Sequence, residues 1–255
     1  MSRIFRPYQK LFLAGLTSLC LGSLAAPSLA QWNGGSYRPS GNVGTPTRTQ
    51  SGATRGTRGC PVAETSPSLV AVVPNNTFGV TLKSHPTFLF YLPTMTAGAT
   101  PPPVEFVIRD LDDNDIYKVR FNTDGQGGIA SISLPESSGV KGLELNKDYR
   151  WSVAIICQMN DRGRDIVTEG LIQRVAVPPE LSPSALEGKS VVEEAEILSR
   201  AGIWYDSVAL IAEIHRQRPL TQWTNILQAV ELLDLINQPL LDGRSSTTPA
   251  RVPNT

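Results

Sequence analysis

Hydrophobic and polar residues alternate with a period of two in several short runs of the chain. The clearest run places five side chains on one face of the backbone: Tyr149, Trp151, Val153, Ile155 and Cys157. Because successive side chains of a strand point to opposite faces, this alternation predicts a half-buried β-strand. Seven or eight short apolar runs, several of them alternating in this way, are separated by turn residues, at positions 69–73, 80–82, 88–91, 104–109, 117–121, 130–134, 149–157 and 166–177. Their spacing predicts an antiparallel β-sandwich over residues 60–178, of the immunoglobulin-like or fibronectin-like kind.

The hydrophobic period becomes helical from Ser190 onwards. Ser190 and Glu193 form the pattern of a capping box, in which the hydroxyl and the carboxylate satisfy amides of the first helical turn. Two further amphipathic stretches follow at about 204–219 and 223–233, so residues 183–238 are predicted to form about three helices. Each apolar stripe is narrow, and the helices must therefore pack on one another or on the sheet. The fold class is α+β overall.

The helical region also contains the spacing of one half of a tetratricopeptide repeat. The matching positions are Gly202, Trp204, Ser207, Ile211 and Pro219. Only one such half-repeat is present, whereas stable arrays need about three repeats. The pattern therefore predicts a helical hairpin with tetratricopeptide-like geometry, and not a peptide-binding groove.

The first thirty residues have the pattern of a signal peptide. Three cations precede an uncharged apolar run at 11–24: Arg3, Arg6 and Lys10. Ser28-Leu29-Ala30 supplies the small-x-small sequence for cleavage between Ala30 and Gln31. The apolar run is shorter than the roughly twenty residues that span a bilayer. We expect an exported protein, periplasmic or extracellular, with no stable membrane anchor after cleavage; a retained signal anchor is the alternative.

Two segments have the composition of disordered chain. Residues 31–59 are rich in Gly, Ser, Thr and Arg and contain almost no aliphatic residue, so they cannot bury enough apolar area to fold. Four cations and no acid lie in this arm: Arg38, Arg48, Arg55 and Arg58. The arm is interpreted as a solvated linker, with a weak electrostatic tether to anionic envelope material as the alternative. Residues 242–255 are expected to form a disordered tail.

Export changes the interpretation of the cysteines. Cys20 is lost with the signal peptide, which leaves Cys60 and Cys157 in a compartment that permits disulfides. A bridge between them closes a loop of nearly a hundred residues and contributes up to about 4–5 kcal/mol in the chain-entropy model. Two buried free thiols are the alternative. The two cysteines and the two histidines, His85 and His215, lack the spacing of metal ligands.

Charge and motifs exclude several functional classes. The chain has 23 cationic and 23 acidic side chains, which argues against the clustered positive charge that binds nucleic acid. No nucleophile elbow, zinc-protease motif, phosphate loop or dinucleotide fingerprint occurs. Residues Asp110 to Asp115 begin like a calcium loop, but position six is Asp115 and position twelve is Phe121, so a hairpin turn is the simpler interpretation. No catalytic residue, metal or cofactor is expected.

Several short motifs stand together in a characteristic order. They are Arg58-Gly59-Cys60, Pro86-Thr87-Phe88-x-Phe90-Tyr91-x-Pro93, Glu105-Phe106-x-Ile108-Arg109-Asp110, Tyr149-Arg150-Trp151 with Cys157, Leu171-Ile172-Gln173-Arg174-Val175 and Gly202-Ile203-Trp204-Tyr205-Asp206. In this arrangement the chain resembles the exported cyanobacterial family catalogued as domain of unknown function 928, over about residues 58 to 236. The resemblance implies an envelope or extracellular setting and a β domain followed by helices. The resemblance identifies no catalytic residue and no ligand in this chain, because the family has no established activity.

These observations favour a non-enzymatic exported protein that binds another envelope protein, such as the external part of a membrane sensor. The candidate contact residues are Trp204, Tyr205, Trp223 and His215, since aromatic side chains dominate interface hot spots. The same side chains serve equally well as a core between helices and sheet. A carbohydrate- or cell-wall-binding module with an exposed aromatic platform is the second hypothesis, and a hydrolase with acids converging in a cleft is the third. The sequence leaves the oligomeric state open.

Overall fold

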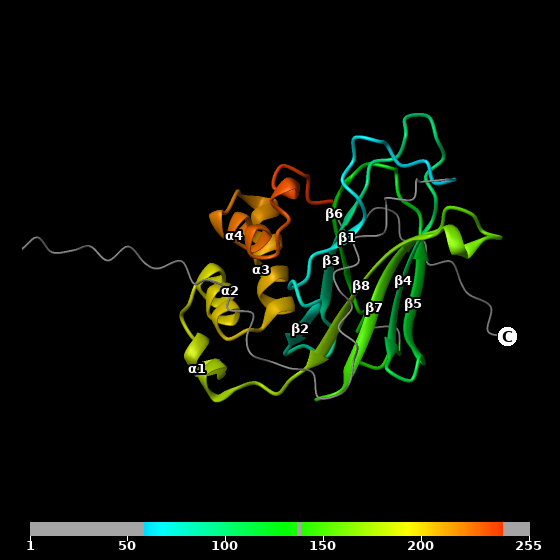
Figure 1. The fold of residues 1–255 in the computed structure, drawn as a ribbon. Coiled ribbons are helices and arrows are strands. Elements are labelled where there is room, and N and C mark those ends of the chain that lie inside the picture. The colour runs from blue at the N-terminus through cyan, green and yellow to red at the C-terminus, as the bar shows by residue number, and fades with distance from the viewer. Residues whose placement is uncertain (1–58, 137–138, 242–255) are drawn as a thin grey trace, which may run out of the picture.

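The computed structural model describes residues 59–136 and 139–241, which form an α+β fold with two facing β-sheets and a group of C-terminal helices (Figure 1). The expected signal peptide, nearly all of the arm at 31–59 and the expected tail at 242–255 lie outside the described residues. All eight of the short apolar runs contain residues of a strand.

One sheet has three antiparallel strands in the order β1-β3-β6. These strands are β1 (Val70–Ala71), β3 (Thr87–Leu92) and β6 (Gly128–Ser133). The other sheet has five strands in the order β2-β8-β7-β4-β5. They are β2 (Phe78–Thr81), β8 (Ile166–Arg174), β7 (Asp148–Ile155), β4 (Val104–Asp110) and β5 (Asp115–Phe121).

The expectation of a wholly antiparallel sandwich is wrong at one pair of strands. β2 runs parallel to β8, with Phe78 opposite Leu171 and Thr81 opposite Arg174, whereas the other pairs of the five-stranded sheet are antiparallel. Period-two alternation reports which face a side chain occupies and carries no information on the direction of the neighbouring strand. The parallel pair therefore left no signal in the sequence.

The core between the sheets follows the predicted alternation. Residues at every second position of β7 are buried: Tyr149, Trp151, Val153 and Ile155. Aromatic rings fill its centre, where Phe88 of β3 lies with its ring centroid 5.1 Å from those of both Phe106 and Trp151. Tilted ring pairs at such distances contribute favourably beyond the area they bury.

Four helices follow the last strand. They are α1 (Pro183–Leu186), α2 (Val191–Arg200), α3 (Trp204–Gln217) and α4 (Thr221–Ala229). The capping box of Ser190 and Glu193 is present at the start of α2, as predicted. The third predicted helix was too long: α4 ends at Ala229 because Glu231 has a positive φ of 57°, and a short 3₁₀ turn, Leu233–Leu235, follows. None of the helices in the described ranges is long and apolar enough to cross a membrane.

The helices lie against the β2 side of the sandwich, with α3 in contact with both β2 and β3 (Figure 1). One continuous cluster of buried apolar residues includes sandwich side chains and the helical residues Trp204, Tyr205 and Trp223. A second, smaller cluster joins Phe78 and Leu171 of the sheet to Leu198 of α2. The helices therefore complete the core of the sandwich, and none of the described helices lies on the outer surface of β4 and β5 (Figure 1).

Candidate interaction site

The first turn of α3 anchors the helices to the sandwich. Tyr205 enters the space between the sheets, where its ring contacts Phe88 and Trp151. Its hydroxyl accepts a hydrogen bond from the Trp151 indole N–H at 2.7 Å and donates one to the Leu171 carbonyl at 3.0 Å. Burial raises the pKa of this phenol well above its ordinary value, so Tyr205 stays protonated and keeps its donor role.

Trp204 and Asp206, on either side of Tyr205, make equally specific contacts. The indole N–H of Trp204 donates to the carbonyl of Val72 at 3.1 Å. One carboxylate oxygen of Asp206 accepts bonds from the Thr81 hydroxyl at 2.7 Å and the Leu82 N–H at 3.1 Å. Burial raises the pKa of Asp206 in spite of these hydrogen bonds. Three consecutive residues thus attach α3 to the edge of the sandwich.

Trp223 and His215 stabilise the turn between α3 and α4. The imidazole stacks on the Trp223 ring with centroids 5.6 Å apart, and its Nδ1 accepts a hydrogen bond from the Leu220 N–H at 2.9 Å. Trp223 is fully buried, and its indole N–H has no hydrogen-bond partner among the described residues. Burial lowers the pKa of His215, which favours the neutral ring that this bond requires.

The structure thus places the four candidate contact residues within the fold. Trp204, Tyr205 and Trp223 are buried, and His215 is half-buried. Trp204 and Tyr205 join the helices to the sandwich, and Trp223 and His215 stabilise the turn between α3 and α4. The three buried side chains offer no surface to a partner, and an interaction role for the half-buried His215 stays a prediction.

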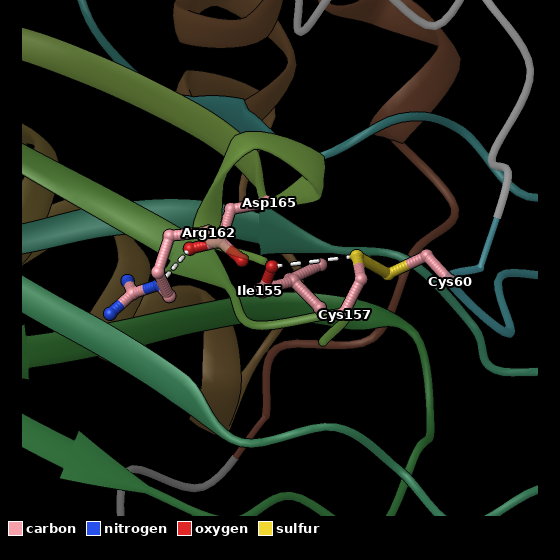
Figure 2. The surroundings of a disulfide bond; sticks show 5 residues. All are labelled: Cys60, Ile155, Cys157, Arg162 and Asp165. Carbon is pink, nitrogen blue, oxygen red and sulfur yellow. Dashed lines mark hydrogen bonds and ion pairs between the residues drawn. A yellow bond between two sulfur atoms is a disulfide. The ribbon is translucent and has the colours of Figure 1, made fainter. Parts of the chain in front are cut away.

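Cys60 and Cys157 form a disulfide, with their Cα atoms 4.7 Å apart (Figure 2). The bridge joins the beginning of the described chain to the segment that follows β7. Figure 2 shows Asp165 and Arg162 on the loop that leads from this segment into β8, close to the disulfide. The predicted pairing is confirmed, and it fixes one end of the five-stranded sheet.

The acidic stretch that resembles a calcium loop is the hairpin turn between β4 and β5. Its first residue, Asp110, accepts hydrogen bonds from the backbone of Asp112 and Asn114 and from the Asn114 side chain, and Lys147 lies 3.4 Å away. The carboxylate oxygens that a cation needs are thus engaged by donors from the turn itself. Residues 59–136 and 139–241 contain no group of three His, Cys, Asp or Glu side chains placed to hold a metal.

The outer face of the five-stranded sheet, on which none of the described helices lies, carries a cluster of paired charges. Its members are Glu105, Lys118, Arg120, Arg162 and Asp165, which we call the Glu105 cluster. Glu105 lies on β4 directly opposite Arg120 on β5, and Lys118 lies two positions earlier on the same face of β5. Arg162 and Asp165 come from the loop that precedes β8. Three elements therefore supply the cluster.

The two carboxylates of the Glu105 cluster are buried and hold the cations above them. Glu105, whose side chain is 6% exposed, accepts bonds from Arg120 at 2.7 Å and from Arg162 at 2.9 Å, one on each oxygen. Arg162 also donates to Asp165 at 2.5 Å, and the Asp165 side chain is only 4% exposed. The cations themselves are 32–44% exposed. The surface therefore presents cationic groups over buried acids.

The directions in which the pKa values of Glu105 and Arg162 are shifted agree with these contacts. Burial alone raises the pKa of Glu105, but hydrogen bonds from Arg120 and Arg162 and the charge of Lys118 outweigh it, and the pKa lies below its ordinary value. The hydrogen bond to Glu105 is the main cause of a raised pKa at Arg162. Three cations face two carboxylates, so the cluster has a local net charge of +1. Since each guanidinium has five N–H donors, donors remain for a further acceptor.

The Glu105 cluster is not identifiable from the sequence alone. Glu105 and Arg120 lie within the predicted strands at 104–109 and 117–121, and the hydrophobic pattern gives no role to Arg162 and Asp165. One signal was present, namely an acid in the middle of an otherwise apolar strand, 104–108. Which cations surround it depends on strand pairing, which a single sequence does not reveal.

The family model described as Domain of Unknown Function (DUF928) matches residues 50–240, which is most of the chain. The chain belongs to this family, as its motifs indicated. No curated protein and no solved structure matches it.

Proposed function

We propose that this chain is an exported, non-enzymatic interaction module that binds an acidic segment of an envelope or membrane protein through the Glu105 cluster. The observation that carries the proposal is the arrangement of two buried carboxylates beneath three partly exposed cations. Guanidinium groups held in fixed positions are well suited to bidentate binding of carboxylates. Arg120 and Arg162 are already ordered by Glu105, so a partner binds them with little loss of side-chain entropy.

Two features support export. The cationic start, the apolar run and the Ser28-Leu29-Ala30 site favour a cleaved signal peptide. The chain also contains the Cys60–Cys157 disulfide. Disulfides persist in oxidising compartments and are rare in cytosolic proteins. A periplasmic or extracellular location follows from this proposal.

The same proposal includes an immunoglobulin-like sandwich and a tetratricopeptide-like helical hairpin. Trp151 packs in the centre of the two sheets and a disulfide lies at the end of its strand, which supports an immunoglobulin-like arrangement. Gly202, with φ of 80°, separates α2 from α3, and the two helices pack on each other. This geometry supports a tetratricopeptide-like hairpin.

The two alternative functions have less support. A carbohydrate-binding platform needs exposed planar rings, yet every aromatic side chain of the described residues is buried or half-buried, and the exposed large apolar side chains are Leu, Met and Val. A hydrolase needs converging acids with an open approach. The two buried acids of the Glu105 cluster are both engaged by Arg162, which suits positioning of cations better than proton transfer.

Binding of a fluorescent octaglutamate peptide tests the proposal directly. Lys118→Glu reverses one exposed charge of the cluster, and Lys141→Glu reverses an exposed charge in the loop after β6 and serves as the matched control. We expect binding by the wild type at low salt, weakened about fivefold or more by Lys118→Glu and unchanged by Lys141→Glu. Equal loss in both variants, or no binding at all, contradicts the proposal.

The same variants identify the partner in envelope extract. A specific partner is retained by the wild-type mature protein and by Lys141→Glu, and is lost with Lys118→Glu. Retention on insoluble wall material alone, insensitive to Lys118→Glu, favours the cell-wall-binding alternative instead.

A further inference from the structure

β5 is the outermost strand of the five-stranded sheet and carries two cations of the Glu105 cluster, Lys118 and Arg120 (Figure 1). It pairs with β4 on one side, and none of the described strands pairs with its other side. A strand at the edge of a sheet presents unpaired N–H and C=O groups, to which a segment of another protein can add as a further strand. In this binding mode the backbone hydrogen bonds supply affinity and alternate side chains supply specificity.

The hydrogen bonds of β4 show which backbone groups of β5 point outwards. In an antiparallel sheet, alternate residues of a strand direct their N–H and C=O groups to its two sides. The Ile156 N–H donates to the Pro103 carbonyl at 2.9 Å, so Glu105, two positions further on, also directs its groups towards β7. Its opposite residue Arg120 therefore directs its groups away from β4, as does Lys118. Among the described residues, no backbone hydrogen bond reaches Lys118 or Arg120 from the open edge.

The side chains of β5 differ in kind between its two faces. Lys118 and Arg120 lie on the outer face of the sheet and are partly exposed. The side chains on the inner face lie opposite buried residues of β4 but are themselves only half-buried: Tyr117, Val119 and Phe121. A segment that extends the sheet beyond β5 therefore meets cations on one face and incompletely buried apolar side chains on the other.

We propose that the acidic partner of the Glu105 cluster adds to β5 as an antiparallel strand in which acidic residues alternate with apolar ones. This inference rests on the proposed function, since the same cations attract the partner. In the antiparallel arrangement an acid lies directly opposite Lys118 and another opposite Arg120, and each exchanges both backbone hydrogen bonds with the residue that it faces. The apolar residues of the partner lie on the inner face and cover Tyr117 and Val119.

The charges of β5 favour an acidic strand over a second copy of the chain. If two copies of β5 pair through their outward-pointing groups, Lys118 of one copy lies opposite Arg120 of the other. Like charges directly opposite each other destabilise a pair of strands, whereas opposite charges stabilise it. Charged side chains on an edge strand are also a usual means of preventing association of identical edges.

Binding of a short fluorescent peptide of alternating glutamate and valine to the mature protein at low salt tests this proposal. Two N-methylated forms of the same peptide are compared with it. Methylation of the glutamate nitrogens removes the N–H groups that face β5 in the proposed arrangement. Methylation of the valine nitrogens removes those that face away, and it is the matched control because charge and composition are the same. We expect the first form to bind about tenfold or more weakly than the unmodified peptide, and the control to bind within about twofold of it.

Three results overturn the proposal. Equal binding of all three peptides means that charge attraction alone holds them, which refutes strand addition and leaves the proposed function intact. Weakening only by methylated valines means that the partner strand is parallel to β5, which refutes the antiparallel register. Absence of binding by these peptides and by octaglutamate contradicts both the proposed function and this inference.

Discussion

We expect individual buried polar groups to make the stability of this protein depend on pH. Asp206 is a carboxylate enclosed at the junction of α3 and β2, and its pKa is raised by burial. His215 is half-buried at the turn after α3, and its pKa is lowered by burial. The sequence identified His215 as a candidate and placed it correctly near the end of a helix. It gave no indication that Asp206 is buried, because an acid in the first turn of a helix is normally exposed and favourable to the helix dipole.

Asp206→Asn is expected to increase the free energy of unfolding at pH 7 by about 1 kcal/mol, since a neutral amide keeps an acceptor for Thr81 and Leu82 without a buried charge. A raised pKa in the folded state means that the wild type loses stability as pH rises from about 4 through that pKa. Urea unfolding between pH 4 and 8 measures the effect. A variant less stable than the wild type at pH 7, with the same pH profile, contradicts this account.

His215→Phe keeps the stacking on Trp223 and removes the acceptor for the Leu220 N–H. We expect a loss of about 1 kcal/mol at pH 7. A lowered pKa in the folded state means that the wild type keeps this stability above about pH 6.5 and loses it as pH falls below that value. Thermal unfolding at pH 7 and pH 5 measures this effect. The difference in Tm between the two pH values should be smaller for the variant than for the wild type. An identical change in both proteins would show that His215 does not titrate as described.

At the scale of elements, alternation and capping patterns predicted the strands and the start of α2, because each is encoded by neighbouring residues. Strand direction and the docking of α3 were not predictable, since they depend on contacts between distant segments. One of these contacts is the approach of the β2 backbone to α3 at Gly79. A Cβ at this position would lie 2.9 Å from the Tyr205 ring and 3.2 Å from Trp204.

Gly79→Ala is therefore expected to destabilise the protein by about 1–3 kcal/mol, because the rings that it meets are held by hydrogen bonds and cannot move freely. Gly163→Ala is the control, since its Cβ would meet only the Asp161 carboxylate, at 3.3 Å. Chemical denaturation monitored by tryptophan fluorescence gives both values. If Gly79→Ala lowers the free energy of unfolding by no more than Gly163→Ala does, α3 does not pack tightly against β2 at this position.

At the scale of the whole molecule, sandwich and helices share one apolar core. Sequence analysis placed them in two regions, 60–178 and 183–238, because the hydrophobic period changes between them. The period of a segment reveals its own secondary structure and does not reveal what its apolar face covers. Because Tyr205 links the helices to the core of the sandwich, we expect the two regions to unfold cooperatively, which two independent regions would not do.

We expect a single unfolding transition, with coincident curves from far-ultraviolet circular dichroism and tryptophan fluorescence. Cys60→Ser/Cys157→Ser should shift the whole transition, lowering the free energy of unfolding by about 2–5 kcal/mol. Two separate transitions, or a shift confined to one probe, would show that the helices unfold independently of the sandwich.

Binding at the Glu105 cluster is tested most directly by mapping the contact surface in solution. Amide chemical shifts of the ¹⁵N-labelled mature protein are recorded during titration with octaglutamate peptide. We predict that the perturbed amides lie on β4, β5 and the loop around Arg162, and that those of α3 and α4 remain unchanged. Perturbations centred on the helices, or spread evenly over the cationic residues of the whole surface, would contradict a binding site at the Glu105 cluster.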